Sequence, residues 1–233
     1  MLSIVIPALN EEKCLPRLLK SIKKQRIDDL EIIVADAGSK DKTIEIAKNF
    51  DCKVVKGGFP SKGKNAGAKA AKGDLILFLD ADTVLPENFL RKTLKEFKER
   101  DLDVASFLTM AEDTFHNLSL KFLFNFPNLL CERILPQALN VILAKRALHE
   151  RIGGFDERVK LGEELDYVRK GNKARKFGVL KKVKVVISPR RFKKDGWFKT
   201  WSKYFLCQIH FLFFGPVKSD IFNYRYGHYD ETD

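Results

Sequence analysis

Two aspartates one residue apart, Asp80 and Asp82, are the side chains of this sequence best suited to hold a divalent cation. They follow the apolar run 74–79, which we predict to be a buried strand, and open α/β sheets bind ligands just beyond the carboxyl ends of their strands. Carboxylate oxygens suit Mg²⁺ or Mn²⁺, and such an ion would bridge to a diphosphate. The alternative is a structural role, in which the two aspartates end the strand and cap a helix that begins at Pro86.

Three other polar features are expected at the same edge of the sheet. Asn10 and Glu11 follow the first predicted strand, and Asp36 ends the second, where an acid can accept hydrogen bonds from a nucleobase. Lys64 opens an alanine-rich stretch that we predict to be helical, and a helix start can place a lysine near a phosphate. Helix capping would explain each feature singly. Their occurrence at the ends of consecutive strands favours a ligand site.

The elements that position these residues follow from the alternation of short apolar runs with helical patterns. We predict strands over 3–7, 31–35, 52–56, 74–79, 104–110, 140–144 and 179–187. We predict helices from Leu15, over 41–50, over 65–72 and from Pro86. Near-continuous apolar strands separated by helices are typical of a mostly parallel sheet covered on both faces, so the expected fold is Rossmann-like α/β. No Gly/Ser-rich or Pro-rich linker interrupts the chain, which favours one continuous domain.

Charge is distributed unevenly along the chain. The net charge is +12, from 43 Lys and Arg against 31 Asp and Glu, and residues 169–203 contain a single acid, Asp195. A basic half of this kind fits nucleic acid, an anionic membrane surface or a phosphorylated substrate. The hydrophobic content of 45% excludes a disordered or collagen-like chain. Abundant Lys and Glu with scarce glutamine is typical of thermophiles.

The cysteines and the first residues indicate the cellular setting. Four cysteines lie far apart without a Cys-x-x-Cys pair, which argues against a disulfide framework or a zinc ribbon. The chain begins directly with an apolar run rather than a basic leader. We therefore expect a reducing, cytoplasmic environment.

Two stretches, 118–131 and 204–217, are unusually apolar. Both are shorter than the ~20 apolar residues that a membrane-spanning helix needs. One interpretation is that they are core helices. The other is that they lie in a membrane interface, because Trp197, Trp201 and several lysines are close by in the sequence.

Taken in order, five motifs resemble those of the family-2 glycosyltransferases, which have the GT-A nucleotide-sugar-binding fold. They lie at 3–12 (Ser-Ile-Val-Ile-Pro-Ala-Leu-Asn-Glu-Glu), 36–43, 62–71, 74–83, and 153–157 with 162–166 (Gly-Gly-Phe-Asp-Glu and Gly-Glu-Glu-Leu-Asp). The resemblance implies a GT-A domain over 1–192, with a nucleotide-binding half at 1–100 and an acceptor-binding half at 101–192. The remaining residues, 193–233, would form a C-terminal helical extension.

On the nucleoside side of the site, the resemblance assigns roles to several of the residues introduced above. Pro7, Asn10 and Glu11 match the loop that lines the nucleoside pocket. Asp36 matches the acid that holds the base, and Lys64 lies in the third motif. These residues would bind the nucleotide part of a nucleoside-diphosphate sugar.

On the diphosphate side, the resemblance assigns the metal. Asp80 matches the first acid of the family's Asp-x-Asp motif, near the ribose or the metal, and Ala81 lies between the two acids. Asp82 matches the second acid, which binds the Mg²⁺ or Mn²⁺ that grips the diphosphate and stabilises its departure. Arg190 and Arg191 resemble a basic loop near the diphosphate, and the arginine fork suits phosphate. A generic basic surface is the alternative for these two arginines.

Glu163 and Glu164 stand where the family usually has Glu-Asp. The second acid of that pair is the general base that deprotonates the acceptor, as direct displacement with inversion requires. Glu164 replaces the aspartate and reaches one methylene further, so the choice between Glu163 and Glu164 stays open. The alternative is that both acids only favour the first turn of a helix.

The expected activity is therefore transfer of a sugar from a nucleoside-diphosphate sugar to an acceptor hydroxyl or phosphate. The apolar and basic stretches favour a lipid-linked acceptor and an anionic membrane surface, at the inner face of the cell membrane. A sugar nucleotidyltransferase is an alternative, but the loop after the first strand is not glycine-rich. A nucleic-acid-binding protein is another, and the acids at the strand ends would repel its phosphates, so no nucleic-acid partner is expected.

Overall fold

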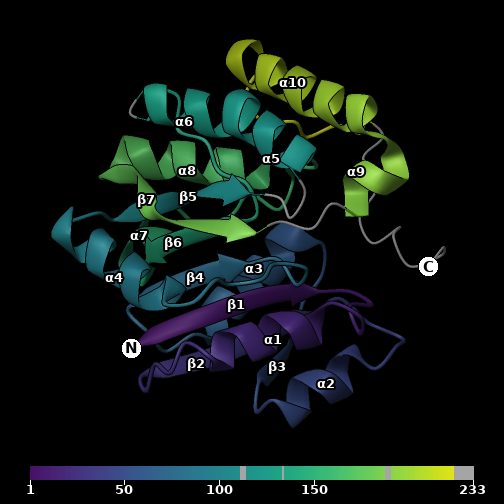
Figure 1. Cartoon of the computed structure of the whole chain (residues 1–233), viewed down its shortest axis with the longest axis vertical. Coiled ribbons are helices and arrows are strands. Elements are labelled where there is room, and N and C mark those ends of the chain that lie inside the picture. The colour runs from purple at the N-terminus through teal and green to yellow at the C-terminus, as the bar shows by residue number, and fades with distance from the viewer. Residues whose placement is uncertain (111–113, 133, 187–189, 223–233) are drawn as a thin grey trace.

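The computed structural model describes residues 1–110, 114–132, 134–186 and 190–222, and shows an α/β fold built on one seven-stranded sheet (Figure 1). The strand order is β3-β2-β1-β4-β6-β5-β7. The strands are β1 (Leu2–Ala8), β2 (Leu30–Asp36), β3 (Lys53–Lys56), β4 (Leu75–Leu79), β5 (Val104–Met110), β6 (Val141–Lys145) and β7 (Phe177–Val186). Only β6 runs against the others, because it pairs antiparallel with both β4 and β5. The prediction of a mostly parallel sheet is confirmed.

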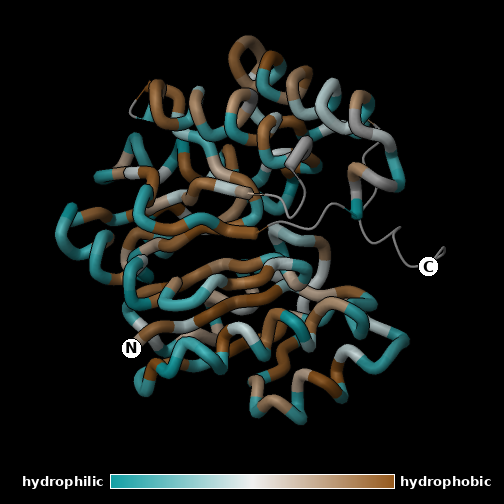
Figure 2. Tube along the Cα trace, viewed as in Figure 1, coloured by the Kyte–Doolittle hydropathy of each residue, from teal (hydrophilic) through white to brown (hydrophobic). Residues whose placement is uncertain are grey.

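All seven strands were predicted to within two residues at each described end. The central strands are detectable because their apolar runs are buried, and the hydrophobic colouring of these strands shows the runs (Figure 2). The edge strand β3 has no buried residue, and its two adjacent valines are only partly exposed. Ile187, the last residue of the final predicted strand, lies outside the described residues.

Helices cover both faces of the sheet. One face packs against α1 (Leu15–Lys23), α2 (Thr43–Asn49) and α4 (Phe89–Glu99), and the other against α3 (Pro60–Ala70), α7 (Arg146–Arg151) and α8 (Glu163–Ala174). Strand β1 shows the two-residue period that this arrangement needs. Ile4 and Ile6 belong to the first core, whereas Val5 belongs to the second.

Two predicted helix starts are wrong. Helix α3 begins at Pro60 rather than at residue 65, because proline has the backbone angle of a first helical turn and needs no N–H partner there. Lys64 therefore lies inside the helix and does not open it. Helix α4 begins at Phe89 rather than at Pro86, because Asn88 adopts a left-handed backbone angle (φ 57°) that ends the preceding turn.

The two apolar stretches of the sequence are helical and lie at the same end of the molecule (Figure 1). The first comprises α5 (Thr114–Leu120), the π-helical turn η1 (Lys121–Asn125) and α6 (Phe126–Leu130). The π-turn ends two residues before Pro127, which cannot donate a helical hydrogen bond. Residues 204–213 of the second stretch belong to α10 (Trp197–Phe213), which follows α9 (Arg190–Asp195), and residues 214–217 lie beyond the helix. The predicted boundary between residues 192 and 193 falls within α9.

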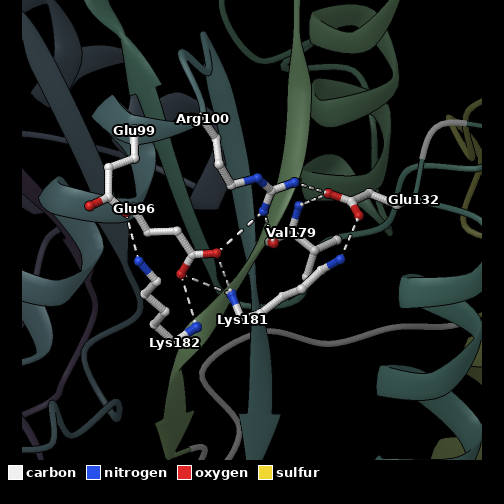
Figure 3. Close-up of polar contacts among 7 residues, drawn as sticks. All are labelled: Glu96, Glu99, Arg100, Glu132, Val179, Lys181 and Lys182. Carbon is white, nitrogen blue, oxygen red and sulfur yellow. Dashed lines mark hydrogen bonds and ion pairs between the residues drawn. The ribbon is translucent and has the colours of Figure 1, made fainter.

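Strand β7 contains a bulge that polar side chains hold in place (Figure 3). Phe107 pairs with Leu180 but Leu108 pairs with Lys184, so residues 181–183 have no partner on β5. The buried carboxylate of Glu96, in α4, accepts the backbone N–H groups of Lys181 and Lys182 at 2.9–3.1 Å. These bonds replace the ladder bonds that the bulge interrupts and tie α4 to β7.

Candidate functional site

A cavity of about 1070 Å³ lies where β1 and β4 end, beside the start of α8. Because the parallel strands point the same way, the segments that follow them meet at this edge. The cavity is lined by eight of the predicted site residues: Pro7, Glu11, Asp80, Ala81, Asp82, Glu163, Glu164 and Arg190. The two that lie furthest apart in the sequence, Pro7 and Arg190, are 183 positions apart, and the fold brings all eight to one cavity.

Lys64 lies beside the carboxylates of this cavity rather than in its lining. Its Nζ donates a hydrogen bond to Glu164 and lies 3.6 Å from Glu163 Oε1 and 3.7 Å from Asp80 Oδ1. The Lys64 side chain is 1% exposed, and its ammonium lies 5.4 Å from the centre of the Phe155 ring. One buried positive charge thus stabilises three carboxylates, and this contact differs from the phosphate contact that we predicted for Lys64.

Asp80 is held from two sides. Besides its ion pair with Lys64, Asp80 accepts a hydrogen bond from Asn140 Nδ2 at 2.9 Å. Removal from water, together with the charges of Glu164, Asp82 and Glu163, raises the pKa of Asp80 to about 8, although Lys64 opposes the rise. Burial by itself would lower the pKa of Lys64, but the surrounding carboxylates raise it above its ordinary value. A further cation at Asp80 would therefore relieve a local excess of negative charge.

Asp82 and Glu11, the latter in the loop after β1, both contact Arg190. Arg190 Nη2 lies 3.1 Å and 3.2 Å from the two carboxylate oxygens of Glu11 and 3.3 Å from Asp82 Oδ2. Burial tends to lower the pKa of Arg190, but Asp82 and Glu11 raise it, so the guanidinium stays charged. The backbone of Arg191 belongs to α9, whereas its side chain and the residues 188 and 189 of the predicted basic loop lie outside the described part of the chain.

Asn10 and Asp36 do not line the cavity but are sequence neighbours of the lining residues Leu9 and Ala37. The carboxylate of Asp36 accepts the N–H groups of Gly38 and Ser39 at 2.8 Å and 3.0 Å. Asn10 accepts the N–H of Lys40, and its own N–H is donated to the Ser39 hydroxyl. These contacts fix the loop after β2 against the loop after β1. A direct contact of Asp36 with a base stays a prediction.

The start of α8 presents the two candidate bases. Gly162 precedes the helix in a left-handed conformation (φ 77°), and a Cβ there would lie 3.0 Å from Phe211 in α10. Acids favour the first turn of a helix, so Glu163 and Glu164 also suit their place structurally. The side chain of Glu164 is 14% exposed and that of Glu163 is 6% exposed, and both face the cavity.

Sequence reasoning missed two contributions to the site. Asn140 was predicted only as the start of a strand, and nothing in its own neighbourhood points to Asp80, sixty positions away. Asn65 bonds both the N–H and the C=O of Phe155 through its amide, which places the Phe155 ring near Lys64. Such pairings depend on how distant elements pack, so local patterns cannot predict them.

A divalent cation in this cavity would depend on the carboxylates of Asp80 and Asp82. The described residues contain no group of three or more His, Cys, Asp or Glu side chains that could hold a metal by themselves. Mg²⁺ ordinarily binds one or two carboxylates and completes its shell with water and substrate phosphates. Asp80 and Asp82, both open to the cavity, fit a cation of this kind, which the protein and a diphosphate would share.

A mostly parallel sheet whose strand ends open into a cavity is typical of α/β proteins that bind a ligand at the carboxyl ends of their strands. The family model described as glycosyl transferase family 2 matches residues 3–184. The chain belongs to this family.

Two relatives of the chain, both glycosyltransferases by name, agree with that assignment. The chain is 34% identical over 113 residues to glycosyltransferase GlyG of Streptococcus pneumoniae, covering 45% of this chain and 37% of the relative. It is 33% identical over 108 residues to the GalNAc(5)-diNAcBac-PP-undecaprenol beta-1,3-glucosyltransferase of Campylobacter jejuni, covering 42% and 35%. The matched part is thus little more than a third of the length of these two relatives.

A solved structure shares the fold. The mannosyltransferase PcManGT from Pyrobaculum calidifontis, in complex with GDP-Man and Mn²⁺, superposes with a TM-score of 0.72 at 18% identity. The superposition covers 89% of this chain and 62% of the mannosyltransferase. The GT-A-like fold that the sequence predicted is confirmed.

Proposed function

We propose that this protein transfers a sugar from a nucleoside-diphosphate sugar to an acceptor, with inversion at the sugar carbon. The observation that carries the proposal is the convergence of Asp80, Asp82, Glu163 and Glu164 on one cavity at the ends of the strands. Membership of the glycosyl transferase family 2 supports it, as does the GDP-mannose in the structural neighbour's complex.

Asp82 and Asp80 are the residues that would hold the divalent cation, Mg²⁺ or Mn²⁺. When bound, the cation would offset the negative charge that develops on the departing nucleoside diphosphate. Arg190, now between Glu11 and Asp82, has the planar donors that suit the same phosphates. Manganese in the complex of the structural neighbour supports this part of the proposal.

Glu164 is the proposed general base. It lines the cavity, it is the more exposed of the two adjacent acids, and its contact with Lys64 orients the carboxylate. An ionised carboxylate can accept the proton of an acceptor hydroxyl as that oxygen attacks the sugar. A phosphate acceptor would need no base, because its oxygens are already charged near neutral pH.

The acceptor is proposed to be lipid-linked. Beyond the carboxylates, the cavity wall is largely apolar and includes Leu120, Phe124, Phe192, Trp201 and Phe205. A wall of this kind suits hydrocarbon better than a free sugar. The Campylobacter relative, by its name, acts on an undecaprenol-linked acceptor. Reaction at the inner face of the cell membrane follows from an acceptor of this class.

Calorimetric titration of UDP, GDP, dTDP and their sugars, with and without Mn²⁺, tests the donor site. We expect one nucleotide to bind, with an affinity that depends on Mn²⁺ and that falls at least about tenfold in Asp82→Ala. Asp74→Ala is the matched control, since Asp74 precedes the same strand at its opposite end and is largely exposed. Failure of every nucleotide to bind with metal present would refute the donor site.

Single-turnover assays of Glu164→Gln and Glu163→Gln test the base. Loss of about 10²–10⁴-fold in rate in the first variant only, with donor affinity unchanged, is the expected result. Equal losses in both variants would contradict the assignment to Glu164. Full activity in both would instead point to a phosphate acceptor.

A further inference from the structure

Large apolar side chains are exposed mainly on two segments of the structure. Of the fourteen that are exposed among the described residues, twelve lie between residues 118 and 134 or between 198 and 221. They are Leu118, Phe122, Phe126, Leu130, Ile134, Phe198, Phe205, Leu206, Leu212, Phe213, Phe214 and Ile221. We call this set the apolar rim. Single exposed apolar residues are ordinary, but a concentration of this kind marks an interaction surface.

Helix α10 shows how the apolar rim is formed. Thr200, Cys207 and Phe211 are buried on one side of the helix. The opposite side is apolar too. Exposed apolar residues recur there every seven positions, at Phe198, Phe205 and Leu212, and Leu206 and Phe213 lie beside this row. A helix at the surface of a water-soluble protein normally turns polar residues outward. Hydrophobic colouring accordingly continues along α10 and the α5–α6 segment beneath it (Figure 2).

The helical parts of the apolar rim carry charges of one sign. Acids stand at its ends, namely Glu132, which pairs with Arg100 and Lys181, and the exposed Asp220. Residues 114–131 and 197–217 contain no Asp or Glu, and their charged residues are Lys121, Lys199 and Lys203. Lys121 and Lys199 are exposed, and so is Lys194 in the preceding helix α9. Apolar side chains bordered by lysine and free of acids are the combination that binds the headgroup region of an anionic bilayer.

The apolar rim is also continuous with the cavity. Phe198 is 85% exposed and Phe205 is 65% exposed, yet both line the cavity that contains the carboxylates. On the other segment, Leu120 and Phe124 line the cavity while their neighbour Phe122 is exposed. A hydrocarbon chain could therefore pass from outside the molecule into the cavity without leaving an apolar surface.

We infer that the apolar rim docks on the surface of an anionic lipid bilayer, with α10 and the η1–α6 segment lying in its interface. No helix among the described residues is long and apolar enough to span a bilayer, so the contact is with one leaflet. Where the proposed function holds, this orientation lets a lipid-linked acceptor reach Glu164 sideways from the leaflet. The docking itself requires neither donor nor cation.

Co-sedimentation with vesicles tests the inference directly. The full chain is mixed with vesicles of phosphatidylcholine alone or with about one third phosphatidylglycerol, without nucleotide or metal. We expect binding to the anionic vesicles that weakens as salt is added. The fourfold variant Phe126→Ser/Leu130→Ser/Phe213→Ser/Phe214→Ser removes exposed side chains that do not line the cavity, and we expect its partition to fall at least about tenfold.

A matched pair of charge variants separates a specific surface from general basicity. Lys121→Glu/Lys199→Glu reverses two charges beside the apolar rim and is expected to weaken binding at least about tenfold. Lys20→Glu/Lys24→Glu makes the same change in net charge at and just after the end of α1, where the lysines are also exposed, and is expected to have little effect. Circular dichroism and the urea unfolding curve of each variant show whether it is folded.

Three results would overturn the inference. The first is equal binding of the chain to neutral and anionic vesicles. The second is an equal loss of vesicle binding in both charge-variant pairs. The third is a chain that binds no vesicles and forms a stable dimer in solution, which the fourfold variant dissociates. The Asp82→Ala variant should bind vesicles like the unaltered chain. Failure of vesicle binding would therefore leave the glycosyltransferase proposal standing, and failure of nucleotide binding would leave the docking surface standing.

Discussion

At the scale of single residues, the most consequential side chain is Lys64, because it is a buried ammonium in contact with three acids. Transfer of a charge into the protein interior is costly unless opposite charges compensate it, and here one cation compensates Glu164, Glu163 and Asp80. The same contacts orient the proposed base. Stability and the proposed catalysis would therefore depend on the same ammonium group.

Replacement of this lysine should destabilise the fold. We expect Lys64→Met to lower the free energy of unfolding by about 3–5 kcal/mol, because the acids would remain buried without their cation. Urea denaturation measures the change. Lys62→Met, two positions earlier in the same helix and exposed, should change the value by less than about 0.5 kcal/mol. Equal stability of the two variants would contradict the role given to Lys64.

At the scale of elements, the contact between α4 and β7 depends on one carboxylate. Glu96→Gln should lower the free energy of unfolding by about 1–3 kcal/mol, since the amide NH₂ would face a backbone N–H of the bulge instead of accepting from it (Figure 3). Glu99→Gln, three positions further along α4, weakens exposed ion pairs with Lys182 and Lys95 and should cost less stability than Glu96→Gln. Thermal or urea unfolding compares the two; a larger loss in the second variant would refute the argument.

Helix α7 supplies a pH-dependent contribution to stability. His149 packs beside Phe78 and Tyr167, and burial lowers the pKa of His149 to about 4. Between pH 6.5 and 4 the unfolded chain binds a proton at this residue and the folded chain does not. The free energy of unfolding should therefore fall as the pH decreases through this window, by up to about 3 kcal/mol.

His149→Gln isolates this contribution from that of the many acids in the chain. We expect the variant to lose less stability than the unaltered chain when the pH is lowered from 7 to 4.5. Urea denaturation at both pH values gives the difference between the two proteins. Parallel losses would mean that His149 is protonated in the folded state.

At the scale of the whole molecule, α10 connects the far end of the chain to the proposed base. Phe211 and Cys207 pack with Leu161 and Leu165, on either side of Gly162 and the first turn of α8. The predicted C-terminal extension is thus part of the wall that positions Glu163 and Glu164. Its helix also contributes the outer lining of the cavity.

Truncation of one side chain tests this connection. Phe211→Ala should lower the free energy of unfolding by about 3 kcal/mol, and at a temperature where it stays folded it should reduce kcat more than donor affinity. The reason is that the cavity left beside Gly162 loosens the start of α8 and not the loops around Asp80 and Asp82. Phe211→Leu should restore most of kcat. A fall in donor affinity with kcat preserved would contradict the argument.

The sequence predicted the sheet better than it predicted the contacts within the site. Strands such as 104–110 are short runs of apolar residues buried on both faces, and a run of this kind has few other stable environments. The residues at the strand ends followed, since a parallel sheet brings them to one edge. Lys64 and Glu164 are one hundred positions apart, and their contact depends on where α8 packs against α3. No local pattern contains that information.

The two outermost strands of the sheet also affect how copies of this protein meet. An outer strand normally offers a row of open N–H and C=O groups to which a strand of another chain can add. On β7, the N–H of Val179 donates to Glu132, and the C=O of Val179 accepts a hydrogen bond from Arg100 (Figure 3). The bulge further along β7 interrupts the row of open backbone groups. At the opposite side, β3 has only four residues and carries an exposed lysine at each end. Fibrous growth by strand addition is therefore disfavoured at both sides, and helices are left as the surfaces through which this protein can associate.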